Sequence, residues 1–243
     1  MSDFKTHITT STVLGVAYGF AGRYVFDLPL DSCMLAGGLC SISGMLPDLD
    51  SDSGIPARET LSFVSTLVPM LLIQRIGELH LSAEQLVLIG AFVYFLVRFG
   101  VGSLFRRFTL HRGMWHSVPA AVIAGIVGFL LCDCEIYIRF YKGWAVILGF
   151  MSHLILDELH SVDMNGRSIR VKKSFGTAIK FFGDKPFANI VTYGCMLLLA
   201  SLVWFDPAFQ RELKSRGIEV PVIARQPDQQ KLTLPPLNLF RQR

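Results

Sequence analysis

Four short polar motifs supply histidine and aspartate residues that could bind a metal ion. In the last of them, His153 and Asp157 are four positions apart, so on a helix both side chains project from the same face. Imidazole and carboxylate groups at this spacing can bind one divalent ion, as the paired histidines of HExxH metalloproteases do. Ionisable residues within an apolar segment are costly and indicate a functional site. The candidate metal ligands from all four motifs are His7, Asp48, His111, His116, His153 and Asp157.

Each motif also has a simpler interpretation when it is taken alone. His7 could be an interfacial polar residue, the pair His111 and His116 could lie at headgroup level, and the helical His/Asp pair could form a structural hydrogen bond. The aspartate-rich run at 48–52 is similar to an EF-hand calcium loop, but Gly54 comes one position too late for that loop. One shared metal site explains all four motifs at once, and we therefore prefer it.

The composition places these motifs in a membrane protein. Hydrophobic residues make up 51% of the 243 residues and charged residues only 17%, with a mean hydropathy of +0.46. Soluble domains carry about 25% charged residues, so this chain lacks the polar surface of a water-soluble globule. Its net charge of +4 is spread over loops between apolar segments, which argues against a nucleic-acid partner. The five cysteines contain no CxxC pair and are expected to be free.

The apolar segments predict an all-α, polytopic transmembrane helix bundle of about six to seven segments. We assign a transmembrane domain to residues 1–205 and a Pro-rich, flexible tail to residues 206–243. The basic stretch at 165–185 is expected to form a surface loop with a short interfacial helix. The segments run approximately over Ile8–Gly22, Ser32–Leu46, Leu61–Ile76, Gln85–Gly102, Val118–Cys132, Gly143–Leu159 and Phe187–Phe205.

The order of these segments predicts that all four motifs meet at one membrane face. If each segment crosses once, the loops at 47–60, 103–117 and 160–186 lie on the same side as His7, and they hold most of the basic residues. The positive-inside rule makes that face cytoplasmic. We expect a multi-pass protein of the cell (inner) membrane. The basic tail would then lie on the other side, which counts against this orientation.

The motifs resemble those of a known family. His7, LPDLD at 46–50, HRGMWHS at 111–117 and HLILD at 153–157 are similar, in type and order, to the LexA-regulated, membrane-bound predicted metal-dependent hydrolases. That family is regarded as related to the zinc-dependent phospholipase C and P1-nuclease superfamily. The resemblance covers roughly residues 7–185. It implies an all-helical core, a cluster of one to three divalent ions, with zinc preferred, and hydrolysis of phosphoester bonds.

We therefore expect a membrane-embedded, metal-dependent hydrolase that acts on a lipid or lipid-linked substrate. In this hypothesis Asp50 is a ligand, a bridging group or the general base, and Arg112 binds a phosphate oxygen through its forked guanidinium. Two alternatives are an ion or proton transporter with an intramembrane His/Asp relay, and a non-catalytic scaffold with a structural metal. The sequence fixes no role for His160.

Overall fold

The computed structural model describes residues 4–50, 54–77, 79, 81–101, 103, 113–165, 168–171 and 179–218. In this part of the chain, helices dominate and one short β-hairpin is present. The elements are α1 (Phe4–Tyr24), α2 (Leu30–Ser43), η1 (Leu46–Asp50), α3 (Gly54–Gly77), α4 (Ala83–Phe95), η2 (Leu96–Val101), α6 (Val118–Leu131), α7 (Ile136–Leu159), β1 (Val162–Asn165), β2 (Ser168–Val171), α8 (Pro186–Trp204) and α9 (Pro207–Ser215).

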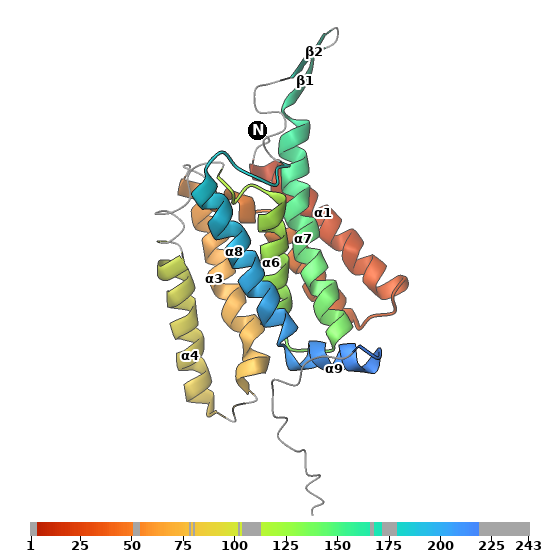
Figure 1. The fold of residues 1–243 in the computed structure, drawn as a ribbon, viewed down its shortest axis with the longest axis vertical. Helices are drawn as coiled ribbons and strands as arrows, with labels where there is room; N and C mark the ends of the chain where they lie inside the picture. The colour runs from red at the N-terminus through yellow and green to blue at the C-terminus, as the bar shows by residue number, and fades with distance from the viewer. Residues whose placement is uncertain are drawn as a thin grey trace, which may run out of the picture.

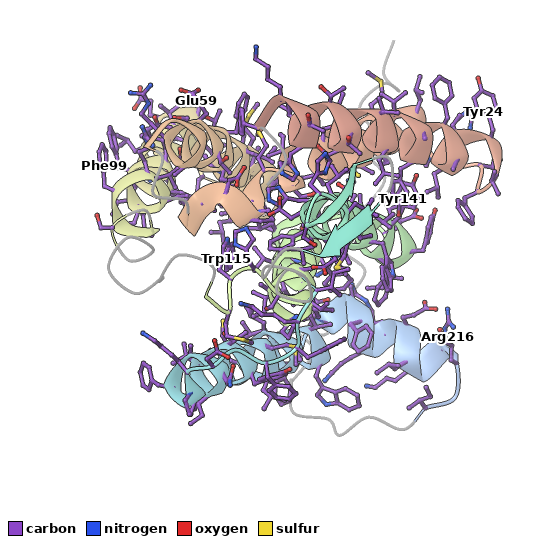
Figure 2. The ribbon with its side chains drawn as sticks, turned by 90° about the horizontal axis from the view of Figure 1, so that it is seen from above. Tyr24, Glu59, Phe99, Trp115, Tyr141 and Arg216 are labelled. Atoms are coloured by element: carbon purple, nitrogen blue, oxygen red, sulfur yellow. The ribbon has the colours of Figure 1, made fainter. Side chains whose placement is uncertain are left out.

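The long helices form a bundle with α7 near its centre. Figure 1 shows α3, α6, α7 and α8 running alongside one another, with α9 lying across their lower ends. Seen from above, α6 and α7 lie between α1 on one side and α8 on the other (Figure 2). The core between α2, α6 and α7 is closed by Phe150 and Leu154 of α7, which pack with Ala120 and Ala121 of α6. Helix α7 is therefore the element around which the other parts of the site are arranged.

Two described helices are long and apolar enough to cross a membrane. They are Ala83–Gly100, which comprises α4 and most of the π-helical turns of η2, and α8. Almost none of their residues are buried inside the protein, as expected of surfaces that face lipid. Each expected apolar segment overlaps a helix, but α2 and α6 have only 14 residues. At 1.5 Å per residue such a helix is about 21 Å long, which is less than the ~30 Å hydrocarbon core.

Helix α7 begins earlier than the sequence predicts. We expected its apolar segment to start at Gly143, because Arg139 and Lys142 interrupt the pattern, but the helix starts at Ile136. Both amino groups of the Arg139 guanidinium donate to the Asp206 carboxylate at 2.8 Å. The guanidinium carbon also lies 4.2 Å from the centre of the Phe129 ring. The partner that allows Arg139 to be buried therefore comes from a distant part of the sequence.

Two further regions differ from expectation. In the 165–185 stretch we expected a surface loop with a short interfacial helix. Its described start belongs to an antiparallel hairpin in which Val162 pairs with Val171 and Asn165 with Ser168, while residues 166–167 and 172–178 lie outside the described residues. The start of the expected flexible tail forms α9, and residues 219–243 lie outside the described residues. The all-α prediction therefore describes the bundle but misses the hairpin.

Candidate metal centre

The last two turns of α7 supply two buried residues of the site. His153 and Asp157 have exposed fractions of 1% and 8%. The Nδ1 atom of His153 lies 2.8 Å from the carbonyl oxygen of Gly44, which can only accept a hydrogen bond. The ring must therefore carry a proton on Nδ1. Its Nε2 atom points toward carboxylates, at 3.8 Å from Oδ2 of Asp157 and 3.7 Å from Oδ1 of Asp48.

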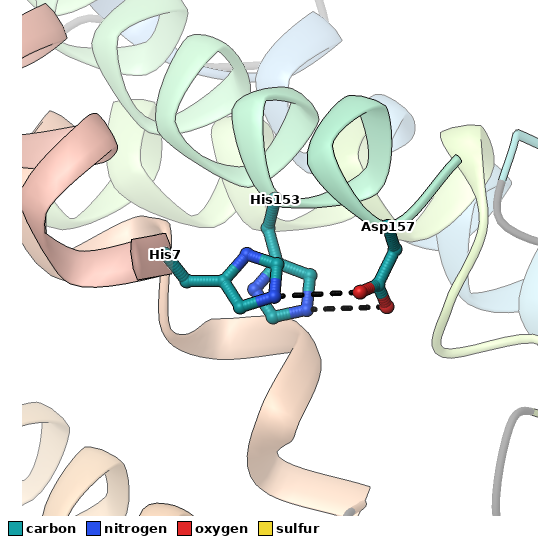
Figure 3. A group of neighbouring side chains, drawn as sticks. All are labelled: His7, His153 and Asp157. Atoms are coloured by element: carbon teal, nitrogen blue, oxygen red, sulfur yellow. Dashed lines mark ion pairs between the residues drawn. The ribbon is translucent and has the colours of Figure 1, made fainter. Parts of the chain in front are cut away.

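His7, from the second turn of α1, completes this side of the site. Its ring stacks on the His153 ring, with centroids 3.7 Å apart and planes 14° apart. Figure 3 shows the two rings side by side, each with a nitrogen facing a different oxygen of Asp157. The Nε2 of His7 lies 3.4 Å from Oδ1 of that carboxylate. The buried Nδ1 of His7 has no hydrogen-bond partner among the described residues.

Asp48 and His116 approach from two segments that lie beyond the ends of short helices. Asp48 belongs to the 3-10 helix η1, which follows α2 after one turn, and its amide donates to Met45. His116 directly precedes Ser117, whose hydroxyl caps the start of α6 by accepting from the Ala120 amide. The His116 ring lies edge-on to His153, with centroids 5.7 Å apart.

A tryptophan links these two segments. The indole nitrogen of Trp115 donates to the carbonyl oxygen of Leu46 at 2.8 Å, and the Trp115 ring packs edge-on against Phe150. This hydrogen bond connects the segment that carries His116 to the segment that carries Asp48. The sequence interpretation missed Trp115, because its position within HRGMWHS gives no sign that its partner is a carbonyl of the other motif.

Small residues let α1, α2 and α7 approach closely enough for these side chains to meet. A β-carbon at Gly44 would lie 2.3 Å from that of Ser11, and one at Gly149 would lie 2.0 Å from the Cys40 carbonyl oxygen. Only glycine fits at such separations. The Ser11 hydroxyl donates to the carbonyl oxygen of Ser41 at 2.9 Å, which fixes α1 against α2. The site therefore depends on close backbone contact just beneath its ligands.

Five of the eight predicted site residues come together, and they form two overlapping groups. In each group the candidate ligand atoms lie within 4.8 Å of one another, and His153 belongs to both. His111 and Arg112 lie outside the described residues, as does the side chain of Asp50. His160 is the C-cap of α7, where it is exposed and its Nδ1 lies 2.9 Å from the Leu156 carbonyl oxygen. The two groups are His7, His153 and Asp157, and Asp48, His116 and His153.

Comparison with known proteins assigns a family. A family model described as YdjM inner membrane protein matches residues 1–169, which include the whole cluster and end before α8. No curated protein and no solved structure matches the chain. Because the family match extends over more than half of the sequence, this chain belongs to the YdjM family of inner membrane proteins.

Proposed function

We propose that this protein is a membrane-embedded, metal-dependent hydrolase that acts on phosphoester bonds of a lipid or lipid-linked substrate. The observation that carries the proposal is the environment of His153 Nε2. Because Nδ1 holds the proton that bonds to Gly44, the Nε2 lone pair of a neutral ring faces Asp48 and Asp157. These three electron-rich groups, the Nε2 lone pair and the two carboxylates, face one another in a buried site and require a positive charge between them. We propose that a divalent cation supplies this charge.

The separations between donor atoms support a metal rather than a hydrogen-bond network. The three measured nitrogen–oxygen distances run from 3.4 to 3.8 Å, beyond the ~2.7–3.2 Å of good hydrogen bonds. Ligand atoms about 2.1 Å from a tetrahedral zinc ion lie about 3.4 Å from one another. The carbonyl that orients His153 is also a usual outer partner of a metal-binding histidine.

The number of lone pairs limits how the two groups can share ions. His153 offers only Nε2, because its Nδ1 is protonated, so it can bind one ion and not two. We assign the first ion to His7, His153 and Asp157, the more deeply buried group. A second ion near Asp48 and His116 would need further donors, and His111 is the residue that the sequence interpretation offers for this position.

The chain's own residues also define the chemistry that we propose. A bound divalent ion would provide a nucleophilic water at neutral pH and stabilise negative charge on a phosphoryl oxygen. Within the same hypothesis, Asp50 is a metal ligand, a bridging group or the base that accepts a proton from water, and Arg112 holds a phosphate oxygen. The sequence resemblance to membrane-bound metal-dependent hydrolases supports this choice of reaction class.

The depth of the site supports a substrate that resides in the membrane. Arg139 pairs with Asp206 just beyond the end of α8, which marks one boundary of the apolar region. His153 follows Arg139 by fourteen positions on the same helix, or about 21 Å at 1.5 Å per residue. In a hydrocarbon core about 30 Å thick, the site then lies near the opposite headgroups, where lipid phosphoesters are found.

Three variants of one helix test the proposal. In His153→Ala and Asp157→Ala, we expect the metal content of the purified protein to fall and hydrolysis of phospholipid substrates to be lost. His160→Ala is the matched control, because it removes an exposed histidine from the same helix without touching the cluster. Elemental analysis and a phospholipid hydrolysis assay provide the two measurements. Full metal retention in His153→Ala would refute the proposed metal centre, and bound metal with no hydrolysis of any lipid phosphoester would favour the scaffold or transporter alternative.

A further inference from the structure

At the end of the bundle opposite the candidate metal centre, α9 is an amphipathic helix with a fixed position. Figure 1 shows it lying across the lower ends of the spanning helices rather than continuing α8. The ring of Phe209 packs near Phe140 of α7 and Trp204 of α8, with centroids 6.1 and 6.5 Å away. One side of α9 therefore packs on the bundle, and its charged residues Arg211 and Lys214 are exposed.

Both ends of α9 are held, so its orientation is defined. Asp206 accepts from the amides of Ala208 and Phe209 at the start of the helix, while its two oxygens bind Arg139 of α7. At the other end, Gly217 has a φ of +76° and its amide donates to the carbonyl oxygen of Lys214. A helix of nine residues is marginal alone in water, and these contacts explain why it forms here.

The surroundings of α9 are those of a membrane interface. Helix α8, which is apolar and leaves its surface exposed, ends at Trp204, three residues before α9 begins. Exposed aromatic side chains gather at the same end of the bundle, as they do at membrane–water boundaries. They are Tyr24, Phe26, Tyr137, Trp204 and Phe205. The outward face of α9 must then lie at the level of the lipid headgroups.

The charges on that face are not neutralised within the described protein. Arg216 is paired with Glu212 at 2.7 Å. Arg211 and Lys214 form no ion pair with any residue in the described ranges, and their spacing of three places them on one side of the helix. We propose that this face of α9 binds the headgroups of anionic phospholipids in the leaflet opposite the candidate metal centre. The proposal does not depend on the hydrolase function.

A local fluorescence measurement tests it. The protein carries three tryptophans, and Trp204 lies beside α9, whereas Trp115 is in the site at the other end. Replacing Trp144, which is exposed on α7, by Phe leaves Trp204 as the exposed, lipid-facing reporter. This variant is reconstituted into vesicles of phosphatidylcholine and phosphatidylglycerol, in which one lipid or the other has brominated chains that quench tryptophan.

We expect brominated phosphatidylglycerol to quench Trp204 more strongly than brominated phosphatidylcholine does at equal mole fraction. The double variant R211Q/K214Q should lower the relative association constant for phosphatidylglycerol about fivefold for each charge removed. The matched control is E212Q/R216Q, which changes one residue of α9 and its C-cap but leaves the net charge of this region unaltered, and it should keep the preference. Quenching by brominated phosphatidylcholine must persist in every variant, which verifies that α8 is still inserted. The proposal would be overturned if the two brominated lipids quench equally in the protein with unaltered α9. It would also be overturned if both double variants lose the preference for phosphatidylglycerol to the same extent.

Discussion

The contact between α2 and α7 at Gly149 gives a prediction that tests the packing beneath the site. A β-carbon at this position would lie 2.0 Å from the carbonyl oxygen of Cys40 and 2.1 Å from Oγ of Ser43. Ordinary contact begins at 3.4 Å, so Gly149→Ala must separate the two backbones by about 1.4 Å, unless the helices rearrange. Both atoms to be displaced belong to the last turn of α2, where a rigid carbonyl cannot rotate away.

This separation should reach the candidate metal centre directly, because Gly44 follows the displaced turn. Its carbonyl oxygen is 2.8 Å from His153 Nδ1, and an added 1.4 Å would take the two atoms beyond hydrogen-bonding distance. Overpacking costs roughly 1–3 kcal/mol and the lost hydrogen bond about 1 kcal/mol, while alanine returns up to ~1 kcal/mol of helix propensity. We expect a net destabilisation of roughly 1–3 kcal/mol, together with a 10–100-fold loss of metal affinity.

The matched control is Gly38→Ala on α2, where an added β-carbon meets nothing within 4 Å. It should leave metal affinity unchanged and stabilise the protein by about 0.5–1 kcal/mol. The free energy of unfolding is measured in mixed micelles, and zinc affinity by competition with a chromophoric chelator. If Gly149→Ala equals Gly38→Ala in both stability and zinc affinity, the close contact between α2 and α7 and its role in orienting His153 are refuted.

Three further predictions concern other parts of the molecule. Trp115→Phe keeps an aromatic ring of smaller size but removes the indole N–H that donates to Leu46, so we expect zinc affinity to fall about tenfold. The lost hydrogen bond should cost about 1 kcal/mol of unfolding free energy, and the smaller ring adds a packing loss beside Phe150. An unchanged affinity would mean that Trp115 does not position the site. Asp206→Asn breaks the buried pair with Arg139 and should cost about 3–5 kcal/mol in unfolding free energy at neutral pH. Burial alone would raise the pKa of Asp206, but hydrogen bonds from Arg139 and the α9 backbone lower it overall. The contribution of the ionised Asp206 to stability is therefore present above the ordinary pKa of about 3.9 and is lost as the pH falls through the folded value. When the free energy of unfolding is measured against pH, the difference between wild type and Asp206→Asn should shrink below about pH 4, and a constant difference would contradict the linkage. Chelation should lower the melting temperature in detergent, because zinc at 100 times its dissociation constant adds about 2.7 kcal/mol, and an unchanged transition after metal removal, verified by elemental analysis, would contradict a metal bound to the native state.

The convergence of distant motifs could be predicted because it depends on the direction in which the chain crosses the membrane at each apolar segment, and not on how side chains pack. Each apolar segment reverses the chain, so polar motifs separated by an even number of segments must return to one face. This reasoning brought His7, Asp48 and His116 to the end of α7 across more than a hundred positions. The spacing of His153 and Asp157 on one helix fixed their relative placement more closely, because helix geometry is local.

Contacts between distant residues could not be predicted in the same way. Arg139 looked like a residue that ends a membrane segment, because its partner Asp206 is 67 positions away and nothing in the local sequence pairs them. The same partnership creates α9 at the start of a Pro-rich tail, where composition favours extended chain. A buried charge is tolerated only when its partner is in place, and the sequence pattern contains the charge but not the partner.

The lengths of α2 and α6 explain why part of the site lies outside regular helices. Each is about 9 Å shorter than the hydrocarbon core is thick. The chain that follows α2 and the chain that precedes α6 therefore lie beside the last turns of the longer α7 and do not extend past its end. The turn and 3-10 helix after α2 carry Asp48 into this space, and the segment before α6 carries His116 into it. Longer helices at these positions would raise both segments above His153. The short apolar segments that form α2 and α6 are therefore the feature that recesses the polar cluster beside α7.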